Sequence, residues 1–221
     1  HDLRITPPAF GFLPAVAADG ASTISGNVEL VVNGANDVQI FLGVPDADDH
    51  LQIDGTFTRG GVGNGDLGQG RAAVVFGQSF DQGLVELLPG ADLTDPGILA
   101  VFGGASTGSP VRTIVNNGQV GSAEVQNNVE LAGNGSYHNL TLGGESATVA
   151  PGASLGATLV AGDLVFDGTN NTYLAEIDDS GNSDLLDIGG TLDLVSETDV
   201  LDVVFLSGDT LNGDYTLATY A

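Results

Sequence analysis

Short apolar or alternating runs, separated by Gly, Asn and Asp, make up most of the chain. No pattern of apolar residues at i, i+3 and i+4 continues for more than about two helical turns. The runs are rich in Val, Leu, Ile and Thr and are bounded by turn-forming residues, which is typical of strands. The chain is therefore expected to be all-β with little helix. Strands are predicted near Val28–Val32, Val38–Leu42, Ala72–Phe76, Gly83–Leu88, Ile98–Phe102, Leu159–Phe166, Leu192–Val195 and Val200–Leu206.

Two segments resemble each other, and each reads as strand, Gly/Asn turn, strand, acidic loop and strand. Residues 26–57 align with residues 162–192, and the alignment places Asp49 opposite Asp184. Such a unit cannot bury its apolar face alone, so copies have to stack on one another. The repeat favours a right-handed parallel β-helix, or β-solenoid, over residues 21–221. A β-sandwich is the alternative.

The first twenty residues differ from the rest of the chain. The stretch Pro7–Ala17 is apolar and interrupted by proline, which excludes a central strand. We expect residues 1–20 to form an apolar N-terminal arm or cap over the open end of the solenoid. The other interpretation is an arm that docks on a neighbouring subunit.

Composition narrows the class of protein. The 221 residues carry 29 acidic and 4 basic side chains, a formal net charge of -25, and 42% hydrophobic residues. The negative charge opposes binding to nucleic acid, and no apolar run approaches the roughly 20 residues of a membrane-spanning helix. Cysteine is absent, so no disulfide can form. The chain begins at His1 without a charged leader, as expected of a mature or recombinant product.

Four stretches in the last third of the chain carry a family resemblance: Ala150–Gly156, Leu159–Leu164, Tyr173–Ile177 and Ser183–Leu192. They resemble the late turns of autotransporter passenger domains and of related secreted and surface-anchored repeat proteins of bacteria. The resemblance covers residues 150–220 well and residues 26–58 in part. It implies a β-helical protein that is secreted or displayed on the cell surface.

The resemblance also implies a structural or adhesive role rather than an enzyme. The expected partners are further copies of the chain, which would build fibres or a surface layer, or a cell-surface or carbohydrate ligand. Because scaffold motifs specify a fold better than an activity, no catalytic residue is predicted.

Calcium is the one cofactor that the sequence suggests. Two aligned loops offer carboxylate and amide oxygens at short spacing, as calcium loops do. The predicted ligands are Asp46, Asp48 and Asp49 in the first loop and Asp178, Asp179, Asn182 and Asp184 in the second. Hydrated turns explain the same residues without a metal. At the level of the whole chain, a halophilic surface or plain solubility explains the acidity as well.

The alternative function is a carbohydrate-active enzyme on a β-helix scaffold, a polysaccharide lyase or hydrolase. Lyases of this kind use a basic residue to abstract a proton, and here only Arg4, Arg59, Arg71 and Arg112 could serve. Carboxylate pairs for hydrolysis cannot be recognised among 29 acids. No phosphate-binding Gly-Lys-Ser/Thr motif occurs.

Overall fold

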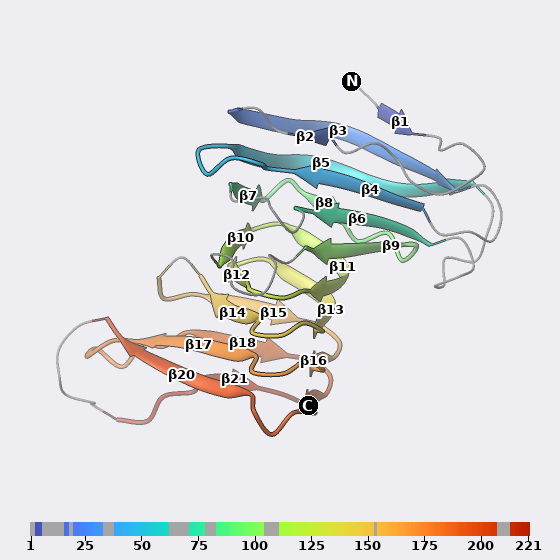
Figure 1. Cartoon of the computed structure of the whole chain (residues 1–221). Helices are drawn as coiled ribbons and strands as arrows, with labels where there is room; N and C mark the ends of the chain where they lie inside the picture. The colour runs from blue at the N-terminus through green and yellow to red at the C-terminus, as the bar shows by residue number, and fades with distance from the viewer. Residues whose placement is uncertain are drawn as a thin grey trace.

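The structure, a computed structural model, describes residues 3–5, 16–17, 20–32, 38–61, 71–77, 83–103, 111–152, 154–206 and 213–221. These residues form 21 strands in one continuous sheet, and every pairing between named strands is parallel. No helix occurs within the described ranges. The expectation of an all-β chain is confirmed, and the pairing differs from the antiparallel pairing of β-sandwiches. Turns of the chain stack along one axis, with the N-terminus at one end and the C-terminus at the other (Figure 1).

The pairings follow three ladders, which the chain visits in the order A, B, C. The long strands β3 (Ala21–Val32) and β5 (His50–Gly61) span A and B, and β11 (Gln119–Val125) and β13 (Ser136–Leu142) span B and C. Ladder A continues with β7 (Leu84–Leu87), β10 (Arg112–Asn116), β12 (Val129–Gly133), β14 (Thr148–Pro151), β17 (Thr172–Ile177) and β20 (Val200–Phe205). Ladder B adds β1 (Leu3–Ile5), β8 (Asp92–Leu93), β15 (Ala157–Val160), β18 (Leu185–Ile188) and β21 (Ala218–Thr219). Ladder C adds β2 (Val16–Ala17), β4 (Val38–Gly43), β6 (Ala72–Phe76), β9 (Ile98–Phe102), β16 (Leu164–Phe166) and β19 (Leu192–Leu194).

Turn length varies while the register of the ladders is kept. Asn117 and Asn134 are hydrogen-bonded neighbours in successive turns and are 17 residues apart in sequence. Arg59 and Asp95 are also neighbours in successive turns, yet they are 36 residues apart. The extra residues leave the stack as loops, which lengthen a turn without changing the strands it contributes.

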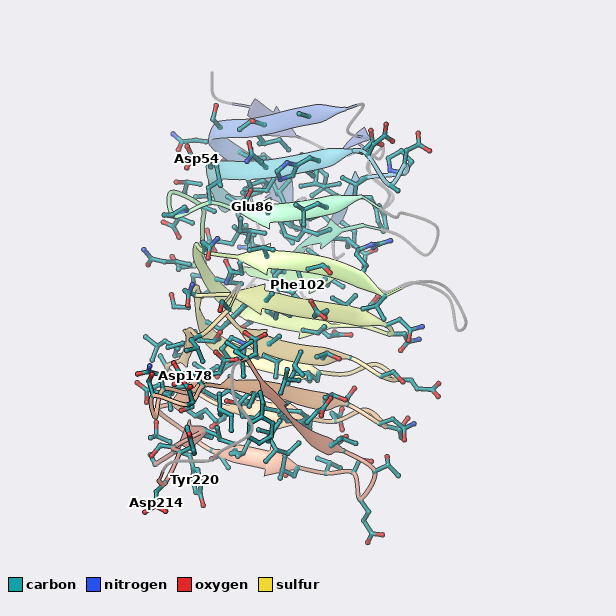
Figure 2. All side chains as sticks on the ribbon, turned by 90° about the vertical axis from the view of Figure 1, so that its left-hand side faces the viewer. Asp54, Glu86, Phe102, Asp178, Asp214 and Tyr220 are labelled. Atoms are coloured by element: carbon teal, nitrogen blue, oxygen red, sulfur yellow. The ribbon has the colours of Figure 1, made fainter. Side chains whose placement is uncertain are left out.

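Apolar columns inside the stack form the core, because alternate residues of a strand face the same side. One column on ladder A runs through Leu51, Val85, Ile114, Leu131, Val149 and Tyr173, all buried. A column on ladder C runs through Leu42, Phe76, Phe102, Val125, Leu142 and Phe166, also buried. Acidic side chains such as Asp178 and Asp214 lie on the outside (Figure 2).

Asn and Asp side chains fasten the corners between ladders. Asn134 Oδ1 accepts the N–H of Ala157 at 3.0 Å, and Asn139 Oδ1 accepts the N–H of Asp163 at 3.0 Å. Asp163 Oδ1 then accepts the N–H of Thr191, one turn further on, at 2.9 Å. At a corner the backbone leaves the ladder, so these side chains supply the acceptors that strands would otherwise provide. The Asn-rich and Asp-rich turns of the sequence therefore connect successive turns.

The two aligned sequence segments lie one ladder apart. Residues 26–57 pass through ladders B, C and A, whereas residues 162–192 pass through C, A and B. The two segments therefore have the same order of strands and turns, but each strand of the second segment lies on the ladder that follows the one used by its counterpart in the first. Of residues 1–20, the backbone of Leu3–Ile5 pairs with β3 and that of Val16–Ala17 pairs with β4; most of the predicted arm or cap lies outside the described residues.

Candidate functional site

The first acidic loop lies between β4 and β5, at a corner between ladders C and A. Asp49 is only 6% exposed, and its carboxylate accepts two backbone N–H groups. Oδ1 accepts from Gly20 at 2.7 Å and Oδ2 from Asp46 at 3.0 Å. Gly83 of the next turn lies close against this loop, since a Cβ there would be 2.5 Å from the carbonyl oxygen of Asp49. Asp46 and Asp48 are exposed.

The second acidic loop lies between β17 and β18, at a corner between ladders A and B. Asp184 is 1% exposed. Its Oδ1 accepts the N–H of Gly156 at 2.8 Å, and its Oδ2 accepts the N–H of Glu176 at 2.8 Å. This aspartate therefore joins its own turn to the previous one, as Asp49 does.

The exposed part of the second loop closes around Asp178. Oδ1 of Asp178 accepts the N–H of Ser180 at 2.9 Å and that of Asn182 at 2.8 Å, while Oδ2 accepts from Asn182 Nδ2 at 2.7 Å. These hydrogen bonds, with the one from the Asn182 side chain first, lower the pKa of Asp178 because they favour the charged carboxylate. Asp179 lies beside it at the surface.

The structure places the two predicted calcium loops at different corners and several turns apart, so their carboxylates do not meet. Within each loop, one aspartate, Asp49 or Asp184, is buried against backbone N–H groups. Asp178 is half-buried and accepts hydrogen bonds within its loop, and the other predicted ligands are exposed. No group of three His, Cys, Asp or Glu side chains that could hold a metal ion occurs among the described residues. Calcium binding at either loop stays a prediction.

Carboxylates crowd the corner around Asp184. Burial raises the pKa of Asp184, and the two backbone donors offset this only in part. The pKa of Glu176 is also raised, first by burial and then by the negative charges of Asp184 and Glu130. The Tyr173 hydroxyl donates to the carbonyl of Leu217 at 2.5 Å, and burial together with Asp184 raises its pKa. Keeping these acids ionised at neutral pH therefore costs folding free energy.

Arg112 is one of the four residues that a lyase could use as a base, but it is buried inside the fold and hydrogen-bonded to the backbone. It is 2% exposed, and its Nη1 donates to the carbonyl of Gly103 at 2.6 Å. The guanidinium group lies over Gly77, where a Cβ would collide with it. A substrate outside the stack could not reach this side chain.

A shallow groove of about 390 Å3 crosses ladder B where the turns are shortest. Ser122, Ser136, His138 and Leu159 are among the residues that line it, and none of the described lining residues is a carboxylate. The groove therefore offers hydroxyl and imidazole groups on an outer face of the stack.

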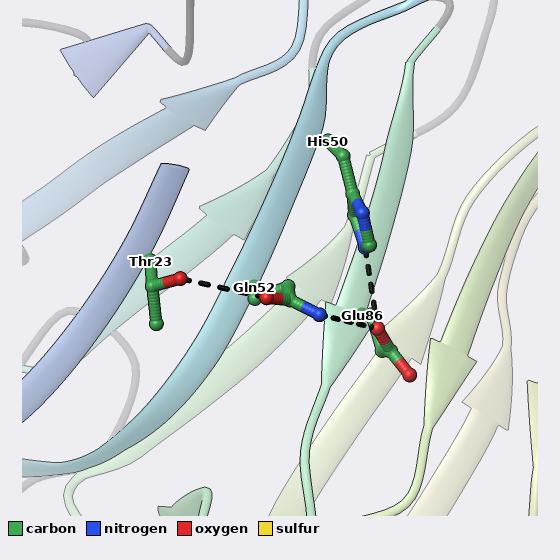
Figure 3. Close-up of polar contacts among 4 residues, drawn as sticks. All are labelled: Thr23, His50, Gln52 and Glu86. Atoms are coloured by element: carbon green, nitrogen blue, oxygen red, sulfur yellow. Dashed lines mark hydrogen bonds and ion pairs between the residues drawn. The ribbon is translucent and has the colours of Figure 1, made fainter. Parts of the chain in front are cut away.

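A row of polar side chains crosses three turns of ladder A on the outside (Figure 3). Thr23 Oγ1 donates to Gln52 Oε1 at 3.5 Å, and Gln52 Nε2 donates to Glu86 Oε2 at 3.0 Å. His50 Nε2 lies 3.2 Å from the same Glu86 oxygen. The register continues this column to the last strand of the ladder, where Asp202 occupies it. Thr23 and Asp202 are thus the first and last members of one column among the described residues.

A large apolar surface at the C-terminal end was not predicted from the sequence. Leu201 follows Tyr173 in the core column of ladder A, and Leu194 follows Phe166 in that of ladder C. The side chains of Leu201, Phe205 and Leu194 are 56%, 50% and 61% exposed, because no described strand lies beyond them. Strand periodicity predicts which side chains face the core, but does not show whether a further turn covers them.

This end of the stack is hollow as well as apolar. A cavity of about 340 Å3 is lined by Phe166, Tyr173 and Leu186 of the preceding turn and by Leu192, Leu201 and Leu217, among others. Large exposed apolar surfaces of this kind are typical of interaction sites.

Comparison with protein-family models, curated proteins and solved structures finds no match to the chain. The described residues contain no helix that is long and apolar enough to cross a membrane.

Proposed function

We propose that the chain is a structural or adhesive protein of the bacterial cell surface or the extracellular space, built as a right-handed parallel β-helix. The observation that supports this most is the continuity of the three parallel ladders, which keep their register through every described turn from β1 to β21. The resemblance of residues 150–220 to autotransporter passenger domains supports the cellular location.

A mechanical role follows from the direction of the backbone hydrogen bonds. They run along the stacking axis, so neighbouring turns are joined by many bonds in parallel. Loops can lengthen a turn without breaking this connection, as the spacings of 17 and 36 residues show. Such a scaffold can hold adhesive loops at a distance from the cell.

The negative charge supports a role outside the cell in contact with water and cations. Most acidic residues on the described surface are exposed, and a charge of -25 keeps the apolar strands soluble until a partner or a cation bridges them. Weak calcium binding at Asp178 and Asp179 or at Asp46 and Asp48 belongs to this proposal.

The cellular location can be tested with an antibody raised against the purified chain. Intact cells of the source organism, or their culture medium, should bind the antibody, and external protease should remove the signal before the cells are lysed. A signal that appears only after lysis would contradict the proposal.

The enzymatic alternative needs its own experiment. The purified chain should leave acidic and neutral polysaccharides without new reducing or unsaturated ends. Release of such ends that His138→Ala, in the groove on ladder B, abolishes would favour a polysaccharide-degrading enzyme instead.

A further inference from the structure

The two ends of the stack have complementary steps. Among the described strands, ladders A and B reach one strand further than ladder C at the C-terminal end, because β20 and β21 follow β19. At the N-terminal end, the described strands of ladders B and C begin one strand before those of ladder A, because β1 and β2 precede β3. The first half of β3 therefore forms the described N-terminal edge of ladder A, and Thr23 and Ser25 on it are exposed.

We propose that a second copy of this chain covers the apolar C-terminal end, in a head-to-tail contact that extends the parallel ladders. This inference rests on the proposed structural role and names the surface through which it acts. β20 of one copy lies beside the first half of β3 of the next copy. The outer edge of β19, the last described strand of ladder C, then pairs with β2 of that next copy. Ladders A and C therefore both continue.

The remaining ladder fits the same arrangement. On ladder B, β21 covers Leu186–Asp187, whereas β1 pairs with Val28–Leu30. Leu3 pairs with Val28, and the register carries this column along ladder B to Ile188. Ile188 is the residue directly after Asp187, so β1 begins one position beyond the last residue that β21 covers. The two short strands therefore follow one another along this ladder. Tyr220 and Ala221, whose N–H donates to the carbonyl of Gly190, lie over the positions of β1 and have to leave the ladder for β1 to pair.

Charge favours the head-to-tail contact over a contact between two C-terminal ends. Asp193, Glu197 and Asp202 are exposed on the last turns, and no arginine lies beyond Arg112 in the sequence. Two such ends face to face would bring carboxylates together without a cation. Head to tail, they approach β1, the strand that contains Arg4, instead. Parallel pairing is also preserved, and a heterologous contact of this kind propagates into an open filament.

The column that contains Thr23 and Asp202 makes the contact testable. In a continued ladder, Asp202 of one copy lies beside Thr23 of the next, about 4.8 Å away between Cα atoms, which is within the range of a disulfide. The chain has no cysteine of its own. The double variant Thr23→Cys with Asp202→Cys should form covalent dimers, trimers and longer chains under oxidising conditions, and reductant should return them to monomers.

Two further variants define the outcome. Asp202→Cys alone should stay monomeric, and Thr113→Cys with Asp202→Cys, which keeps one cysteine in the middle of ladder A, should give no covalent series. Efficient dimers of the single variant would show a contact between C-terminal ends and overturn the proposal. Only monomers from the Thr23 and Asp202 pair would overturn it too.

The apolar end provides a test without cysteine. In sedimentation velocity at raised salt, which screens the net charge, the wild-type chain should associate as its concentration increases. Leu201→Asp and Phe205→Asp should abolish association, while Val111→Asp, at a residue 60% exposed away from both ends, should not. Equal association of all three variants would contradict the proposal. A monomeric chain that is nevertheless displayed on cells would contradict this contact alone and leave the structural role in place.

Discussion

Asp49 and Asp184 have the same hydrogen-bonding role at two different corners of the stack. Each carboxylate accepts the N–H of a glycine in the preceding turn, Gly20 or Gly156, and the residue after each aspartate donates its own N–H to the carbonyl of that glycine. Both side chains are buried. The aspartate and the glycine thus form a clamp that is repeated after rotation by one side of the stack.

Removal of either clamp should destabilise the fold. Asp184→Ala leaves two backbone N–H groups without their acceptor in a buried corner, at a cost of about 1–3 kcal/mol for each unsatisfied group. We expect the free energy of unfolding in urea to fall by about 2–6 kcal/mol, and Asp49→Ala to behave alike. Asp48→Ala removes an exposed carboxylate from the same loop and serves as the control. Equal stability of the Asp48 and Asp49 variants would contradict the clamp.

The sequence pattern identifies this pair of residues but not their role. The alignment of residues 26–57 with residues 162–192 paired Asp49 with Asp184 from the surrounding pattern alone. A carboxylate that accepts backbone N–H groups and one that binds calcium have the same neighbours in sequence, so only the position of Gly20 and Gly156 in space separates the two roles. The rotation by one ladder could not be predicted either, because each ladder alternates in the same way.

The strands were predicted where the apolar runs are long and bounded by turns. Ala72–Phe76 and Ile98–Phe102 agree with β6 and β9 to the residue. Leu159–Phe166 is divided into β15 and β16, because the chain turns a corner at residues 161–163. The strands β10 to β14, in the short turns of the stack between residues 111 and 151, were not predicted, because the apolar residues of each run are small or few.

Position along the stack should decide the cost of removing an aromatic side chain. Phe102 is fully buried; its ring centroid lies 5.7 Å from that of Phe76 and 6.5 Å from that of Tyr137. Phe102→Ala should therefore cost about 3–5 kcal/mol of unfolding free energy, the usual value for a buried aromatic residue. Phe205→Ala makes the same change on the half-exposed last strand and should cost well under half as much in the monomer. Similar losses from both variants would show that the last turn is covered.

Calcium binding, if the two loops contribute, should be weak and independent. The loops lie at different corners, and Asp49 and Asp184 are already engaged with backbone donors, so Asp46, Asp48 and Asp179 are left as exposed ligands. Asp178 would exchange its hydrogen bonds with Ser180 and Asn182 for the cation. At about 1 mM calcium, in the weak extracellular range, we expect a rise in melting temperature. Asp178→Asn with Asp179→Asn should remove part of that rise, and Asp46→Asn with Asp48→Asn another part. Calorimetry without heat and an unchanged melting temperature would refute the prediction.

The crowded acids around Asp184 predict an unusual dependence of stability on pH. The pKa values of Asp184 and Glu176 are raised in the folded chain, above ordinary values of 3.8 and 4.5. The folded state therefore binds these protons more tightly than the unfolded state, so this contribution to stability grows as pH falls through the folded-state pKa values and is complete below the unfolded ones. The lowered pKa of Asp178 acts in the opposite direction: its contribution is present above the unfolded value and is lost as pH falls through the folded one.

Glu176→Gln isolates this effect, because it removes one of the repelling charges and keeps the shape of the side chain. At pH 7 to 8 the variant should melt about 2–4 °C above the wild type, the shift that about 1 kcal/mol produces in a domain of this size. Below about pH 4, where the wild-type carboxyl groups are protonated, the difference should vanish. Glu145→Gln changes the net charge equally at an exposed site outside this corner and should not reproduce the dependence on pH. A constant difference between Glu176→Gln and the wild type across this range would show that packing, and not the repulsion from Asp184, sets the stability of this corner.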